Sequence, residues 1–69
     1  MKAKEGLIFQ KYYNENNINN IPKCEIRGII DNEIIVLLCK SKKGKQYYKC
    51  IEMQEFDYNV EAGVYTQLN

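Results

Sequence analysis

The side chains that could carry covalent or metal chemistry are three thiols, Cys24, Cys39 and Cys50, in a chain without histidine. A cysteine nucleophile usually depends on a histidine or on another group that lowers its pKa, and histidine is also the commonest metal ligand. The cysteines are widely spaced, unlike the close pairs of structural zinc sites. We therefore expect no enzyme activity, metal or other cofactor, and we interpret all three cysteines as free thiols that are buried as small apolar side chains.

A basic segment runs from Lys40 to Lys49 and contains five lysines and two adjacent tyrosines. Lysines there can contact phosphates while a tyrosine stacks on an exposed base, as in single-strand binders. Lysines on a turn also keep a protein soluble and discourage edge pairing, and the net charge of +1 is low for a dedicated nucleic-acid-binding domain. The candidate nucleic-acid contacts are Lys42, Lys43, Lys45, Tyr47 and Lys49.

The C-terminal end is acidic and aromatic. Residues 1–49 carry a net charge of +5, whereas residues 50–69 carry −4 and no basic side chain. Carboxylates interleaved with tyrosines suit a basic groove or an ordinary contact on another protein, although a solvated helix face gives the same pattern. If Met53, Phe56 and Val60 face a core, Tyr58 points away from it and is exposed. The candidate protein contacts are Tyr58, Glu55, Asp57, Glu61 and Tyr65.

Six tyrosines are many for a chain of 69 residues. In each adjacent pair, Tyr12–Tyr13 and Tyr47–Tyr48, one ring must face outward if both residues lie on a strand. Exposed tyrosine is enriched at protein interfaces. This surplus favours a binding role, including self-association through a strand edge.

The elements that would position these side chains are mostly strands. The clearest element is a hairpin formed by residues 23–30 and 33–40. The pair Asp31-Asn32 between them suits the positive φ angles of a two-residue turn. The run from Ile34 to Cys39 is apolar at every position, which predicts a central strand covered on both faces. In chain order we expect a strand over 6–13, an Asn-rich loop over 14–22, strands over 23–30 and 33–40, a turn over 41–44, a strand over 45–53, one to two helical turns ending near Gly63, and a strand over 64–68.

This order predicts a single mostly-β domain over residues 1–69. It is the order of elements in small SH3-like barrels, and an antiparallel β-meander with one short helical turn near the C-terminus fits it equally. An open sheet of three or four strands with the helix packed on one face is the main rival. The chain shows no apolar stretch long enough to cross a membrane and no signal peptide, so we expect a cytoplasmic protein without a membrane partner.

A short Asn- and Lys-rich chain with a bare β-meander and no catalytic residues resembles small accessory proteins of phages and other mobile elements. The resemblance implies a host-takeover or anti-defence factor that occupies the surface of a host enzyme, and it assigns no residues. We therefore expect a non-enzymatic protein-binding module, in the form of an inhibitor of a host or defence protein. The alternative is a small nucleic-acid-binding barrel that uses the hairpin over residues 40–49.

Overall fold

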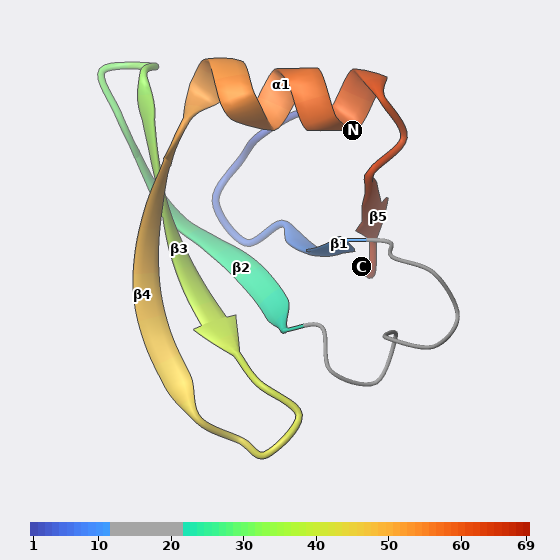
Figure 1. Ribbon diagram of the computed structural model, residues 1–69. Helices are drawn as coiled ribbons and strands as arrows, with labels where there is room; N and C mark the ends of the chain where they lie inside the picture. The colour runs from blue at the N-terminus through green and yellow to red at the C-terminus, as the bar shows by residue number, and fades with distance from the viewer. Residues whose placement is uncertain (12–21) are drawn as a thin grey trace.

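Runs of β-branched and aromatic residues form one antiparallel sheet, and a single helix packs on one of its faces (Figure 1). The computed structural model describes residues 1–11 and 22–69, so Tyr12, Tyr13 and residues 14–21 of the predicted Asn-rich loop lie outside the described residues. The described elements are β1 (Ile8–Lys11), β2 (Lys23–Ile30), β3 (Ile34–Lys40), β4 (Gln46–Glu52), α1 (Met53–Glu61) and β5 (Tyr65–Gln67). None of the described helical residues forms a helix both long and apolar enough to cross a membrane.

The strand order is β4-β3-β2-β1-β5, with antiparallel pairing at each step. The strands β4 and β5 therefore lie at opposite edges, and the sheet is open. The prediction of a mostly-β fold with a short helix near the C-terminus is confirmed. The barrel form is wrong, because the described β4 and β5 do not pair and the sheet does not close.

The two predicted turns of the meander are confirmed by backbone geometry. Asp31 and Asn32 have φ angles of 52° and 56°, and the Glu33 amide donates to the Ile30 carbonyl over 2.9 Å. These angles define the tight turn that matches the twist of a hairpin. Gly44, with a φ of 85°, closes the second turn, where its amide donates to the carbonyl of Ser41.

The helix α1 spans nine residues, about two and a half turns, slightly more than the sequence predicts. Gly63 follows its C-terminus with a φ of 73°, a conformation that glycine adopts without a Cβ clash. The amide of Gly63 donates to the Val60 carbonyl, and that of Val64 donates to the Asn59 carbonyl. These two bonds form a Schellman motif, which ends the helix and directs the chain into β5.

The core lies between α1 and the face of the sheet beneath it, here called the inner face. Its centre is a cluster of three rings, Phe9 of β1, Phe56 of α1 and Tyr65 of β5, with centroids 4.5 to 5.5 Å apart. Packed rings at these separations stabilise a core beyond the area that they bury. The other buried side chains are Leu7, Ile26, Ile35, Leu37, Cys39 and Ile51.

The central strand β3 departs from its predicted environment. It is hydrogen-bonded on both sides, as expected, but its side chains alternate between buried and half-buried. Ile35, Leu37 and Cys39 face the core, whereas Ile34, Val36 and Leu38 point to the opposite face. The prediction that both faces are covered is therefore wrong for the described residues, because α1 covers only one of them.

Candidate protein-binding face

The face of the sheet opposite α1, here called the outer face, is apolar and has no described element over it (Figure 1). Its middle row consists of Ile34, Val36 and Leu38, all half-buried by their neighbours in the sheet. On β4 the register places Cys50 opposite Val36, and Tyr48 opposite Leu38. Further exposed or half-exposed apolar side chains on this face are Ile8, Ile30 and Leu68.

The outer face is hollowed rather than flat. Gly28 lies opposite Val36, and a Cβ added at Gly28 would meet no atom within 4 Å. Toward the basic end of the sheet, a hollow of about 180 Å³ lies between Ile8 and Leu38, with Lys23 and Lys40 at its rim. Contiguous exposed apolar surface that is rimmed by polar residues marks interaction sites in soluble proteins.

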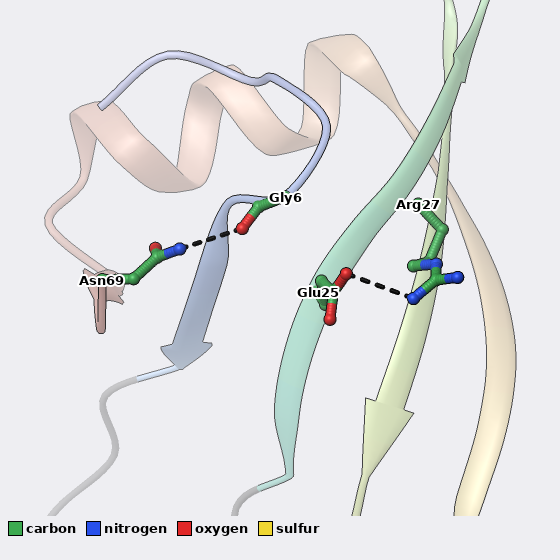
Figure 2. A network of polar contacts seen from close by, with 4 residues as sticks. All are labelled: Gly6, Glu25, Arg27 and Asn69. Carbon is green, nitrogen blue, oxygen red and sulfur yellow. Dashed lines mark hydrogen bonds and ion pairs between the residues drawn. The ribbon is translucent and has the colours of Figure 1, made fainter.

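The strand β2 carries a polar interruption and a bulge across the outer face, because Glu25 is the register partner of both Ile8 and Leu38 and lies between them. The register shifts between Ile26 and Gly28, so Arg27 is the extra residue. Its guanidinium lies 3.3 Å from the carboxylate of Glu25 (Figure 2). Both side chains are solvent-exposed, so this ion pair adds little stability.

The edge of the sheet at β5 is short and tied down by the C-terminus. The side-chain amide of Asn69 donates to the Gly6 carbonyl over 2.9 Å (Figure 2). Its amide oxygen accepts the Ile8 amide over 3.0 Å. The strand itself has three residues. The longer free edge of the described sheet is therefore that of β4.

The free edge of β4 runs over seven residues, of which only Ile51 is buried. The amide of Met53 donates to the Glu33 carbonyl, so the backbone polar groups at Met53 face β3. Because direction alternates along a strand, those at Tyr47, Lys49 and Ile51 also face β3. The amides that point to the free edge are those of Gln46, Tyr48, Cys50 and Glu52. Among the described strands, none pairs with them.

Charge along β4 changes sign from one end to the other. Its first end joins the exposed turn that carries Lys42, Lys43 and Lys45. Its last residue, Glu52, borders a hollow of about 500 Å³ that Glu33 and Asp57 also line. A strand that pairs with β4 therefore meets positive potential at one end and negative potential at the other.

The basic hairpin places its five predicted nucleic-acid contacts on the surface, but not on one face. Lys42, Lys43, Lys45 and Lys49 are exposed. Tyr47 and Tyr48 are 41% and 68% exposed, and as strand neighbours they point to opposite faces of the sheet. One bound strand of nucleic acid therefore cannot stack on both rings at the same time.

The acidic residues predicted to contact a protein are exposed on α1, and Asp57 lines the hollow beside Glu33 and Glu52 at the end of β4. Glu55, Asp57 and Glu61 are exposed, and Tyr58 is 71% exposed, as the helical spacing predicts. Tyr65 is different, because it is only 9% exposed and its ring packs on Phe9 and Phe56. Its hydroxyl accepts a hydrogen bond from Asn59 over 3.3 Å. Tyr65 is thus a core residue and not a surface contact.

The three thiols occupy three environments. Cys39 is buried, Cys24 is half-buried and Cys50 is exposed on the outer face, so the prediction that all three are buried is wrong for Cys50. Burial, and after it the adjacent Cys39 thiol, raise the pKa of Cys24 to about 12. Partial loss of hydration, with the two thiols nearby, also raises the pKa of Tyr47.

No protein-family model, curated protein or solved structure matches this chain. What the protein binds is therefore inferred from its own surface.

Proposed function

We propose that the protein is a non-enzymatic binding module that takes up an extended segment of another protein along the free edge of β4 and across the outer face. One observation carries this proposal: the apolar outer face is continuous with an unpaired edge strand, and no described element covers either of them. Addition of a strand to an exposed sheet edge is a common mode of peptide recognition. It satisfies backbone groups and buries alternate side chains in one step.

The edge geometry supports such an added strand. The side chains of Tyr48 and Cys50 lie on the outer face, and the amides of the same two residues point outward from the edge. A segment paired with β4 would thus place every second side chain beside Tyr48 and Cys50. Backbone bonds would supply affinity, while Tyr48 and Cys50 would select those alternate side chains.

The charge pattern of β4 sets the chemistry of the partner segment. We infer an antiparallel strand with apolar residues at alternate positions and acidic residues at its C-terminal end, opposite Lys42, Lys43 and Lys45. Basic residues at its N-terminal end would lie near Glu52 and Glu33. Complementary charge of this kind fixes direction and register and speeds encounter more than it raises affinity.

From the resemblance to phage accessory proteins, we infer that this binding inhibits a host or defence protein. A small module that covers a strand-binding surface of a cytoplasmic host or defence protein would inhibit that protein by occupation alone. The helix α1 packs on the inner face of the sheet (Figure 1). Its exposed Tyr58 and Glu61 are therefore available to a second contact, whereas Asp57 lines the hollow beside Glu52.

A nucleic-acid-binding function has one observation in its favour, the five exposed lysines of the hairpin. The opposed directions of Tyr47 and Tyr48 weaken it, because stacking would engage one ring only. The nearly neutral chain also lacks the broad basic surface typical of such domains. We therefore treat nucleic acid as an outcome that the following experiment can detect.

A crosslinking experiment at Cys50 tests the proposed function. Cys50 is the exposed thiol, whereas Cys39 is buried and the raised pKa of Cys24 keeps that thiol protonated, so a maleimide photo-crosslinker should label Cys50. The matched control is a Cys50→Ser, Glu61→Cys variant, which places the same reagent on α1. A Cys50→Ser, Gln46→Cys variant probes the other end of β4.

In a lysate of the native host, we expect crosslinks from positions 50 and 46 to one protein, mapped by mass spectrometry to an extended segment with alternating apolar residues. The control on α1 should not trap that segment. Crosslinks to nucleic acid, to a second copy of this chain alone, or to the same protein from α1 and not from β4 would each overturn the proposal.

A further inference from the structure

Cys24 and Cys39 face each other across the inner face of the sheet. They are direct partners in the register of β2 and β3, and their Sγ atoms lie 3.1 Å apart. Cys50, the third thiol, lies on the outer face of β4. The sheet thus separates one paired dithiol from one isolated thiol, although the sequence spaces all three widely.

The backbone at this pair has the geometry that a disulfide needs. The amide of Ile26 donates to the Leu7 carbonyl, and the Ile26 carbonyl accepts the Gly6 amide. The backbone groups of Ile26 therefore point toward β1, and by alternation so do those of Cys24. Cys24 and Cys39 consequently form a non-hydrogen-bonded pair between β2 and β3. The Cα atoms of such pairs lie about 4.5 Å apart, within the range of about 4.4 to 6.8 Å found in disulfides.

A small reagent can reach the pair. Both cysteines line a hollow of about 160 Å³ on the inner face, together with Tyr47, Lys11 and Lys49. Cys39 is almost completely buried, whereas Cys24 is half-buried. A reagent in the hollow would therefore meet Cys24 first.

We propose that Cys24 and Cys39 are a site of reversible intramolecular oxidation, with glutathione disulfide as the class of oxidant. The Cys24 thiolate attacks one sulfur of the oxidant, whose S–S bond breaks and releases one glutathione thiolate. Cys39, once deprotonated, then attacks the Cys24 sulfur of this mixed disulfide and releases the second glutathione. The two protein thiols lose two electrons and two protons in total, and the oxidant gains them as two glutathione thiols.

Two properties of the product follow. The new bond closes the loop between β2 and β3, so the oxidised chain should melt about 10 °C or more above the reduced chain. Because the attacking thiol, with its pKa of about 12, is protonated at neutral pH, oxidation should be slow there and should accelerate roughly tenfold per pH unit as long as the pH stays below this pKa. The pair therefore suits a slow response to an oxidising environment rather than rapid sensing.

The experiment equilibrates the full chain in glutathione buffers of increasing oxidation, quenches with acid, and counts free thiols by alkylation and intact mass. We expect a transition from three labels to one, with the remaining label at Cys50. The Cys50→Ser variant should pass from two labels to none. In the Cys24→Ser and Cys39→Ser variants this disulfide cannot form, so the number of labels should not fall by two in one transition. Circular dichroism should show the higher melting temperature of the oxidised wild type.

Three results would overturn this proposal. One is retention of all three labels in the most oxidising buffer. Another is a glutathione adduct on Cys24 that Cys39 does not displace. The third is a disulfide-linked dimer through Cys50 as the sole oxidised product. The first two results do not bear on binding at the outer face, since the two sites lie on opposite faces of the sheet.

Discussion

The Gly28→Lys variant is expected to bind the protein trapped from Cys50 at least about 100-fold more weakly than wild type. Gly28 lies in the middle of the outer face, and a side chain there has open space above it. The variant should therefore fold normally while placing an ammonium group in an apolar contact. Burial of an unpaired charge is among the most unfavourable changes at an interface. Titration calorimetry with the purified partner measures the effect.

The matched control is Tyr58→Lys, which places the same charge on the exposed surface of α1. Its affinity should stay within about twofold of wild type, since that surface lies across the molecule from the outer face. Melting temperatures of both variants should stay near that of wild type, because a side chain at Gly28 meets no atom within 4 Å of its Cβ and Tyr58 is exposed. Equal losses of affinity in the two variants would contradict the assignment of the contact to the outer face.

Replacement of Phe56 by alanine is expected to destabilise the fold by about 3 to 5 kcal/mol. Phe56 is fully buried and is the one ring by which α1 joins the cluster with Phe9 and Tyr65. Truncation removes the apolar contacts and leaves a cavity that the sheet below cannot easily fill. A domain of this size has roughly 3 to 10 kcal/mol of stability in total, so most of the margin should be lost. Urea denaturation followed by circular dichroism measures it.

Tyr58→Ala is the control on the same helix, because it removes an aromatic ring of similar size from an exposed position. Its free energy of unfolding should change by no more than about 0.5 kcal/mol. A similar loss in both variants would contradict a specific role for the buried ring, since alanine favours a helix more than either aromatic residue does. A loss below about 1 kcal/mol for Phe56→Ala would show that α1 does not anchor the core.

Local chemistry made much of this fold predictable. Asp31-Asn32 and Gly44 are residue types suited to the turns that they form, and Gly63 is suited to the end of a helix, so the meander and α1 could be placed from single positions. The helical spacing of Met53, Phe56 and Val60 also gave the direction of Tyr58. In each case, neighbours within a few residues decide the outcome.

The environment of β3 was predicted wrongly. A strand that is apolar at every position has the pattern of a strand buried on both faces, and this pattern does not show whether another element covers each face. The predicted elements include a single short helix, and a helix of nine residues is only about 13 Å long. That helix can cover one face of a sheet of this size but not both. The sequence predicts only one element, the short helix, that can cover the sheet. Together with the apolar pattern of β3, this number indicates that one face of the sheet is left uncovered.

The candidate site depended on long-range register, which the sequence does not display. Tyr65 follows the helix on a three-residue strand, and its pairing with Lys11 of β1 directs its ring inward. The contact between Cys24 and Cys39 likewise depends on the bulge at Arg27, which sets the pairing of β2 with β3. Exposure of Cys50 follows from the place of β4 at the sheet edge, which only the strand order reveals.

Amide hydrogen exchange of β4, with and without the trapped partner, tests the central claim most directly. In the free chain, the amides of Tyr47, Lys49 and Ile51 should be protected by β3, whereas those of Gln46, Tyr48, Cys50 and Glu52 should exchange rapidly. On binding, these four amides should become slow together, because a strand paired at the free edge accepts hydrogen bonds from all of them. Unchanged exchange at these four amides, with new protection on the surface of α1, would contradict binding at the edge of β4.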